Sequence, residues 1–401
     1  MTLLECRVHM LSLPTIRHVI GMLVAILLFV TTTNLHYNRT ALTGILPYRS
    51  TTHKQETTNS KIDVKPAIFQ LSHGQHAVVN NQSKYALIVS TPCLVILAGK
   101  QSDTRYAVFS ANWDGDSYRY SFMLPLTTMA WRRIGYGSVV LIVGNLQNWR
   151  NNPTRNYILE STLEKGAIVV FLQGAPAVNS VMLSQISRLL AAAFVPFNSK
   201  LNLVLLTTDA DIWPGNETAY ELPSKLVSIK VTNAFCCGKF NHKGTSYQMY
   251  PMTNIIANLT TWRMMIRRHI STISCANDIV TYAKREFGSI ATRVVHKGGN
   301  DGWYMDQHIA SIWIADWNRH HNSVSYVGRY CRKDRIDRIR WAPRTLYGIV
   351  DAHILVEAHK EGTWQRIRPL LILLYGNTSS EYHWCEKYRK QFVKLISPMA
   401  N

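Results

Sequence analysis

Short apolar runs alternate with amphipathic segments over residues 85–211. The runs typical of β-strands are YALIVS, CLVILAG, YAVFSAN, SVVLIVG, AIVVFLQ and LNLVLLTT. The helical patterns between or before them are MLPLTTMAWRRIGYG, PTRNYILESTLEKG and NSVMLSQISRLLAAAF. Strands that helices cover on both faces read as continuous Val, Ile and Leu runs. The pattern therefore predicts an α/β fold with a Rossmann-related, doubly wound parallel sheet.

The pattern is less regular after residue 216. TNIIANLTTWRMMIRRHI and NDIVTYAKREFG each predict a helix, and GGNDGWYMDQHIASIWIADW predicts a turn followed by a helix. We expect residues 85–401 to form one catalytic-type domain, in which residues 85–215 carry the sheet and residues 216–401 build the other wall of a cleft.

The N-terminal region predicts a membrane anchor. VIGMLVAILLFV is uncharged and apolar, although it is short for a span of about 20 residues. Arg7 and Arg17 precede it, which by the positive-inside tendency places residues 1–18 in the cytosol. No small-x-small cleavage pattern follows. We predict an uncleaved signal-anchor at 19–33 in a single-pass type II topology; the alternative is a cleaved signal and a secreted protein.

Residues 34–84 are rich in Thr, Asn, Ser, His and Gln and predict a stem. Two features agree with a lumenal domain after it. N-x-S/T sequons begin at Asn38, Asn81, Asn216, Asn258 and Asn377. The cysteines after the anchor are Cys93, Cys236, Cys237, Cys275, Cys331 and Cys385. Six cysteines allow three disulfides in fifteen possible arrangements, and the sequence does not choose among them.

The charge balance favours an anionic partner. The 401 residues include 44 Lys and Arg against 24 Asp and Glu, a formal net charge of +20. Nucleic acid, anionic membrane, nucleotide phosphates and acidic glycans all fit this excess, but a lumenal location argues against nucleic acid. The sequence has no P-loop, no G-x-S-x-G elbow and no H-E-x-x-H pair, which weakens kinase, sulfotransferase, serine-hydrolase and zinc-protease assignments.

The run LVLLTTDADIWP ends an apolar strand in two aspartates, Asp209 and Asp211. Residues two apart in an extended segment point to the same side, so both carboxylates would face one point at the carboxyl end of the sheet. Carboxylates in this arrangement suit Mn²⁺ or Mg²⁺, which also bind phosphate oxygens and water. The alternative is an ordinary pair of turn residues, since Pro214 and Gly215 follow closely.

A type II anchor, a Thr- and Asn-rich stem and an α/β half ending in TTDADIWP resemble Golgi glycosyltransferases of the GT-A fold. The resemblance covers the architecture from about residue 85 onward, but only the D-x-D matches as a motif. It implies that Asp209 and Asp211 hold Mn²⁺ against the diphosphate of a nucleotide-sugar, with a UDP-sugar as the expected donor, and that residues 85–215 form the nucleotide-sugar half.

The resemblance implies further roles in the second half. Asp306 in GGNDGWYMDQ would be the general base that deprotonates an acceptor hydroxyl, with Asp301 as a second candidate. The alternative is that both aspartates cap a helix. His353 in DAHIL would complete the metal site, although one histidine among 15 is more often structural.

Two other stretches offer donor-binding residues. Arginine forks in RYCRKDRIDRIRWAPR, among them Arg332 and Arg335, suit a diphosphate or an acidic acceptor glycan; a solvated basic face is the alternative. The turn after YAVFSAN carries Asn112, Asp114 and Asp116. In GT-A folds this position touches the base and ribose of the nucleotide.

We therefore predict a metal-dependent glycosyltransferase that moves a sugar from a nucleotide-sugar to a glycan or glycoprotein acceptor. The expected location is the Golgi membrane, with the endoplasmic reticulum as an alternative. Two rival functions remain: a lumenal metal-dependent phosphohydrolase, and a non-catalytic glycan-binding or scaffold protein on a transferase-like fold.

Overall fold

The computed structural model describes residues 85–99, 103–112, 118–174, 180–197, 202–292, 302–328 and 334–397. The chain divides into two compact units, Met1–Gln70 and Leu71–Asn401, and every described residue belongs to the second. The predicted tail, anchor and stem therefore lie outside the described residues. Among the described helices, none combines the length and the apolar character that crossing a membrane requires.

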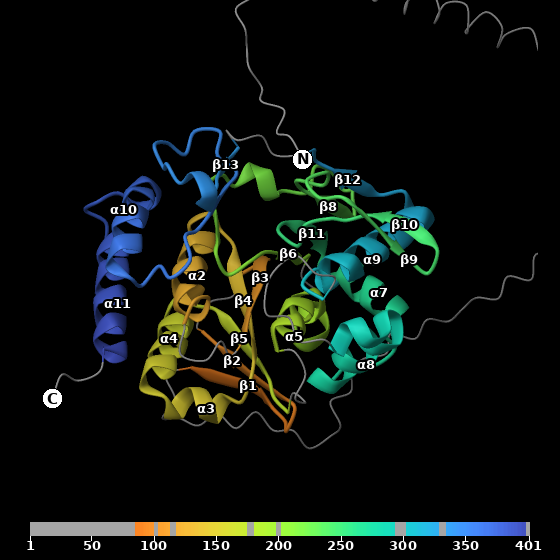
Figure 1. Ribbon diagram of the computed structural model, residues 1–401, viewed down its shortest axis with the longest axis horizontal. Helices are drawn as coiled ribbons and strands as arrows, with labels where there is room; N and C mark the ends of the chain where they lie inside the picture. The colour runs from red at the N-terminus through yellow and green to blue at the C-terminus, as the bar shows by residue number, and fades with distance from the viewer. Residues whose placement is uncertain are drawn as a thin grey trace, which may run out of the picture. The chain divides into compact units, whose positions relative to one another are not determined.

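Within the described residues, a sheet of nine strands forms the centre of the second unit (Figure 1). In spatial order its strands are β1 (Ala86–Ser90), β2 (Leu94–Ala98), β5 (Ile168–Leu172), β4 (Gly137–Val143), β3 (Arg105–Asn112), β6 (Val204–Thr207), β11 (Ile255–Asn258), β8 (Ile229–Val231) and β12 (Val324–Tyr326).

The four strands β5, β4, β3 and β6 are parallel neighbours, as the apolar runs predict. On one side, β2 pairs antiparallel with both β5 and β1, and on the other β11 pairs antiparallel with both β6 and β8. The α/β class is thus confirmed, and parallel pairing holds for these four central strands and for β8 with β12 at one edge, while the other pairs are antiparallel. Parallel and antiparallel strands of this sheet both appear in the sequence as apolar runs, so the pattern does not reveal the direction of a strand.

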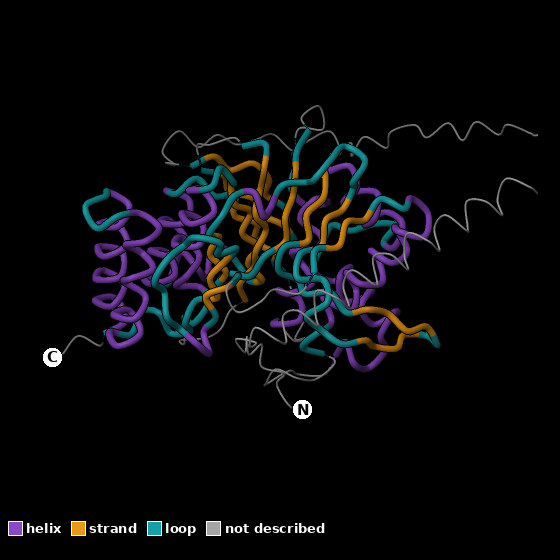
Figure 2. Tube along the Cα trace, turned by 90° about the horizontal axis from the view of Figure 1, so that it is seen from above, coloured by secondary structure: helices purple, strands orange, loops and turns teal. Residues whose placement is uncertain are grey.

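Helices cover both faces of the sheet (Figure 2). One face packs against α2 (Leu124–Arg133), α4 (Pro153–Glu164), α10 (Glu361–Tyr375) and α11 (Ser380–Ile396). The other packs against α5 (Ser180–Ser187), α7 (Leu259–His269), α8 (Ala276–Phe287) and α9 (Met305–His321). Alternate residues of β4 enter the two cores, Val139 and Leu141 on one side and Val140 and Ile142 on the other.

Shorter elements complete the described part. The short helices are α3 (Leu146–Asn151), α6 (Ala191–Phe194), η1 (Ser121–Met123), η2 (Arg188–Leu190), η3 (Thr218–Tyr220), η4 (Gly288–Thr292) and η5 (Arg338–Arg340). A hairpin joins β9 (Lys239–His242) to β10 (Thr245–Gln248). A small sheet has the order β13 (Arg335–Ile336), β14 (Asp351–His353) and β7 (Ile212–Pro214), and it joins the segment after the D-x-D to the C-terminal third of the chain.

The predicted helix over TNIIANLTTWRMMIRRHI is wrong in its first part. Residues Ile255–Asn258 form β11, and α7 begins only at Leu259. Ile255, Ile256 and Ala257 are fully buried between β6 and β8, so their apolar side chains serve the sheet rather than a helix face. Asn258 has an extended backbone at the N-cap position, which separates the strand from the helix.

The sheet changes its direction of growth between β3 and β6. From β3 the chain passes through α2 to β4 and through α3 and α4 to β5, then returns through α5, η2 and α6 to place β6 on the other side of β3. Such a reversal leaves a crevice beyond the carboxyl ends of the two strands, where ligands of open α/β sheets bind. Asn112 ends β3, and Asp209 follows β6 by two residues.

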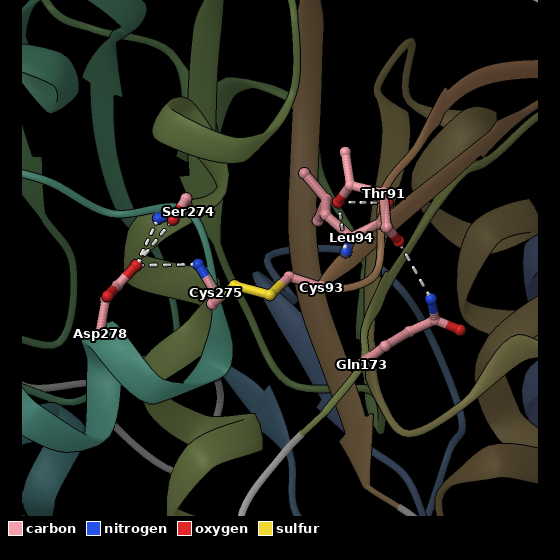
Figure 3. Close-up of a disulfide and its surroundings, with 7 residues drawn as sticks. All are labelled: Thr91, Cys93, Leu94, Gln173, Ser274, Cys275 and Asp278. Atoms are coloured by element: carbon pink, nitrogen blue, oxygen red, sulfur yellow. Dashed lines mark hydrogen bonds between the residues drawn. A yellow bond between two sulfur atoms is a disulfide. The ribbon is translucent and has the colours of Figure 1, made fainter. Parts of the chain in front are cut away.

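A disulfide between Cys93 and Cys275 ties the β1–β2 turn to the start of α8, 182 residues away in sequence (Figure 3). Both ends are held locally. The Asp278 carboxylate accepts from the N–H groups of Ser274 at 2.6 Å and Cys275 at 2.9 Å. The bond therefore fastens an edge hairpin to a helix on one face of the sheet.

The other cysteines differ from the expectation of three disulfides. Cys236 and its neighbour Cys237 form a disulfide with each other. Cys385 is a free thiol buried in α11, where burial raises its pKa to about 12. Cys331 lies outside the described residues. The three disulfides that six cysteines allow are therefore not all formed, since Cys385 is a free thiol within the apolar core.

Replacing both Cys93 and Cys275 by alanine is expected to lower the free energy of unfolding by about 4 kcal/mol, because the bond closes a long loop in the unfolded chain. Denaturant unfolding of the oxidised protein measures the difference. A reductant should destabilise the parent chain more than the double variant. If the parent chain and the double variant are equally stable without reductant, the Cys93–Cys275 disulfide does not form in solution.

Candidate active site

A pocket of about 420 Å³ lies beyond the carboxyl ends of β3 and β6. It is lined by Ser110, Ala111, Asn112, Tyr120, Val181, Ser184, Gln185, Arg188, Asp209, Ala210, Asp211, Ile212, Pro251, Met252, Thr253, Trp303, Asp306, Gln307, Arg335, Arg338 and His353. These residues come from both halves of the described unit. Six of the residues singled out in the sequence meet here: Asn112, Asp209, Asp211, Asp306, Arg335 and His353.

The D-x-D forms a turn rather than the expected extended segment. The N–H of Ile212 donates to the carbonyl of Asp209 at 3.1 Å, which closes the turn. Thr127 of α2 donates to the carbonyl of Ala210, and the N–H of Ile354 donates to that of Asp211 at 2.8 Å. Both carboxylates reach the pocket, but they differ in exposure: the Asp209 side chain is 35% exposed and the Asp211 side chain 5%.

Arg188 lies between two carboxylates and is itself 7% exposed. One terminal nitrogen donates to Asp209 and to the carbonyl of Thr208 at 2.8 Å. The other donates to Oδ2 of Asp306 at 2.5 Å. Burial alone would lower the pKa of Arg188, but the two aspartates outweigh it and raise the pKa, so the guanidinium stays charged.

The pKa values of the two carboxylates that contact Arg188 shift in opposite directions. Burial opposes ionisation of Asp209, but the charge and hydrogen bond of Arg188 prevail and lower its pKa. Asp306 is 1% exposed, and burial together with the charge of Asp209 raises its pKa even though Arg188 acts in the opposite direction. Asp306 is therefore a stronger base than an ordinary aspartate.

Asp211 has a separate pair of partners. Arg338 of η5 donates to its Oδ2 at 2.6 Å, and Nε2 of His353 lies 3.5 Å from the same atom. The pairing of β14 with β7 sets His353 opposite Ile212, which explains this proximity. Burial and the charge of Arg338 lower the pKa of His353 against the pull of Asp211, so its imidazole is neutral near pH 7 and able to bind a metal.

Arg335 lines the pocket but already has a carboxylate partner. It forms a two-pronged ion pair with Asp351, with Nη2 to Oδ2 at 2.8 Å, and Asn254 donates to the same oxygen at 3.3 Å. Asp351 is fully buried, so this pair fixes β13 against β14. Asn112 at the end of β3 lies 3.5 Å from the hydroxyl of Ser180. The other predicted residues, Asp114, Asp116, Asp301 and Arg332, lie outside the described residues.

The main residue that sequence reasoning missed is Arg188. A signal was present, because SQISRLLAAAF contains one charged residue, an arginine directly before the apolar run LLAAAF, and a buried charge needs a partner. Arg338 belongs to the basic stretch discussed above, but its contact with Asp211 joins residues 127 positions apart, which a charge pattern does not encode.

The candidate metal ligands of the pocket fit a hard divalent cation only in part. Among the described residues, no group of three or more His, Cys, Asp or Glu is placed to hold a metal ion. Asp211 and neutral His353 form a pair at a spacing that suits two ligands of one cation, and the arginine on Asp211, Arg338, is 24% exposed. Asp209 is instead held by Arg188, which is 7% exposed. Mg²⁺ and Mn²⁺ accept few protein ligands when phosphate oxygens and water complete the shell. The fitting residues are therefore Asp211 and His353.

Comparison with solved structures gives similarities of low score. The described fold is similar to an active-site mutant of LgtC, with a TM-score of 0.37 and 11% identity over 71% of this chain and 99% of that one. It is similar to the apo form of the glycosyltransferase GlyE of Streptococcus pneumoniae TIGR4, with a TM-score of 0.37 and 11% identity over 72% of this chain and 64% of that one.

A third similarity is to the catalytic domain of Drosophila beta-1,4-galactosyltransferase 7, with a TM-score of 0.22 and 13% identity over 40% of this chain and 51% of that one. No family model matches the sequence, and the search of curated proteins gave no match. Scores this low support no conclusion about activity, so the function proposed below is based on the pocket and on the features of the sequence.

Replacing Arg188 by leucine is expected to lower the free energy of unfolding by about 3–5 kcal/mol, because it leaves Asp306 buried without its counter-charge. Denaturant unfolding measures the loss. The double variant Arg188→Leu/Asp306→Leu removes both charges and should recover part of the stability. A single variant as stable as the parent chain would show that the ion pair does not exist in solution.

Proposed function

We propose that the chain is a metal-dependent glycosyltransferase that uses a nucleotide-sugar, with a UDP-sugar as the expected donor. The observation that supports it is the convergence of Asp209, Asp211, Asp306 and His353, from three separate regions of the chain, on one pocket at the switch point of the sheet. This is the position where doubly wound sheets bind nucleotides.

In this proposal the pocket residues divide the work of binding the donor. Asp211 and His353 would hold Mn²⁺ or Mg²⁺, which supplies positive charge to the diphosphate as it leaves. Arg338 is 24% exposed and lies beside this pair, where a guanidinium fork suits a phosphate. The amide of Asn112 lies at the end of β3, where it would hydrogen-bond the nucleoside.

Asp306 is the residue we assign to the acceptor. Attack of a sugar hydroxyl on the anomeric carbon requires removal of its proton, and a carboxylate with a raised pKa performs this step better than an ordinary one. Oδ1 of Asp306 accepts from the N–H of Gln307 at 2.8 Å and Oδ2 from Arg188, so both oxygens are fixed in orientation. Arg188 would act as a positioning residue that orients Asp306 and Asp209.

We propose a lumenal location at the Golgi membrane, in agreement with the N-terminal anchor predicted at 19–33. The acceptor half would face glycans or glycoproteins that pass through the secretory route. Two sequons in the described part are accessible to the modification that such a location permits, since Asn216 and Asn377 are both exposed in turns.

The activity is tested with the full chain in a non-ionic detergent and a panel of UDP-sugars, by following UDP release and sugar transfer with and without Mn²⁺. Asp211→Asn and His353→Ala should each lower turnover about 100-fold or more, because each removes a group that supports charge on the leaving diphosphate. Asp316→Asn is a matched control, because Asp316 pairs with Arg268 and does not line the pocket.

Other outcomes would redirect the assignment. Phosphate release from simple esters without sugar transfer would favour a phosphohydrolase. Glycan binding that all three variants retain, with no turnover on any donor, would favour a non-catalytic binding protein. Turnover that is indifferent to Mn²⁺ in a folded parent chain would remove the metal from the proposal.

The location is tested by expressing the chain in a cell with a secretory route. Asn216→Gln and Asn377→Gln should each remove one glycan, seen as a step in electrophoretic mobility that glycosidase treatment abolishes in the parent. Thr218→Ala should remove the same glycan as Asn216→Gln, because it destroys the same sequon. A parent chain whose mobility does not respond to glycosidase would refute the lumenal assignment.

A further inference from the structure

The loop of residues 337–350, here called the basic loop, is tied to the pocket at both ends. At its start, Arg338 donates to Asp211 at 2.6 Å. At its end, Val350 leads directly into β14, whose last residue is His353. The N–H of Val350 donates to the carbonyl of Asp334 at 2.7 Å, which closes the base of the loop. Both ends of this loop therefore adjoin residues of the metal-binding pair proposed above or their partners.

The apolar residues of the basic loop divide into two groups. Trp341 donates from its indole to the carbonyl of Arg366 in α10 at 2.7 Å, and Leu346 packs against the core. These two residues anchor the loop. In contrast, the side chains of Ile339 and Tyr347 are 87% and 93% exposed. These two side chains do not pack against the rest of the described structure, although Trp341 and Leu346 anchor the loop that carries them.

Two arginines lie between these exposed side chains. Arg340 and Arg344 are both exposed, and neither has an ion pair with a described residue. The other two arginines of this region are engaged, Arg335 with Asp351 and Arg338 with Asp211. The outer surface of the basic loop thus presents two available guanidinium groups beside an aromatic ring.

We infer that the basic loop is the acceptor-docking surface and that the acceptor is an acidic glycan. Arg340 and Arg344 bind its carboxylate or sulfate groups through paired hydrogen bonds, and Tyr347 stacks on a sugar ring. That this glycan is an acceptor depends on the proposed glycosyltransferase function; that the loop binds it does not. The net charge of +20 draws such a ligand toward the protein from a distance.

A membrane surface fits the basic loop less well. Binding to a bilayer increases with the apolar area that enters it, and one isoleucine with one tyrosine supplies little. The exposed polar groups, by contrast, match the chemistry of a charged sugar chain. The loop also has both ends next to the pocket, which agrees with a ligand that takes part in the reaction.

The test measures binding of a heparin octasaccharide and of oligogalacturonate to the full chain in a non-ionic detergent by calorimetry. The fully methyl-esterified oligogalacturonate is the neutral comparison, because esterification removes the charge of each carboxylate and leaves the sugar chain unchanged. Arg340→Gln/Arg344→Gln should weaken binding of both acidic probes about tenfold, since two charge contacts of modest strength are lost. Raising the salt concentration should narrow this difference.

Three further variants make the test specific. Arg150→Gln/Arg267→Gln removes two exposed arginines from α3 and α7, and it should bind the probes as the parent does. Tyr347→Ala should weaken binding, while Tyr347→Phe should retain it because the ring remains. An effect of the control pair as large as that of the loop pair would overturn the inference, because binding would then follow net charge alone.

Two more outcomes would also overturn it: equal affinity for the acid and its methyl ester, or hydrogen-exchange protection of residues 337–350 by phosphatidylserine nanodiscs and not by the acidic probes. None of these measurements requires turnover. Loop-dependent binding without transfer would leave the acidic-glycan surface in place and remove its role as an acceptor site. Transfer without loop-dependent binding would support the proposed glycosyltransferase and overturn the inference that the loop docks the acceptor.

Discussion

The contact of Arg188 with Asp209 and Asp306 is the interaction on which the pocket depends. Arg188 comes from the crossover between β5 and β6, Asp209 from the end of β6, and Asp306 from the first turn of α9. Removing one member would leave a charge buried without its partner, which costs far more than the intact group contributes to stability. Such a group is therefore better explained by the geometry it imposes, because it joins the first half of the sheet to a helix of the second.

A second arginine, Arg338, pairs with the other aspartate of the D-x-D. Arg338 neutralises Asp211 from the start of the basic loop, and β14 carries His353 to the same carboxylate by pairing with β7. Each aspartate of the D-x-D thus has its own guanidinium partner. The cation site therefore includes one carboxylate of the motif rather than both. Asp211 with His353 suits a metal, while Asp209 serves the ion pair that orients Asp306.

Much of this arrangement could be predicted from the sequence. Apolar runs identified the central strands, and the rule that ligands bind beyond the carboxyl ends of such strands singled out Asp209 and Asp211. Asn112 was singled out by the resemblance to GT-A folds. The rest depended on information that local patterns lack. Strand direction at the sheet edges, the turn at 209–211 and the partner of Arg188, 118 residues away, are all decided by tertiary packing. β11 was mistaken for a helix because four strand residues continue directly into α7.

The charges of the pocket connect the two proposals. Asp209, Asp211 and Asp306 are contacted by Arg188 and Arg338, whereas Arg335 is already paired with Asp351, so the lining has no excess positive charge before a donor enters. A diphosphate brings further negative charge, which a cation or a guanidinium must meet. Arg338, at 24% exposure against 7% for Arg188 and 16% for Arg335, is the most accessible of the three. Because Arg338 lies at the start of the basic loop, a donor phosphate bound to it would adjoin the segment that we assign to the acceptor.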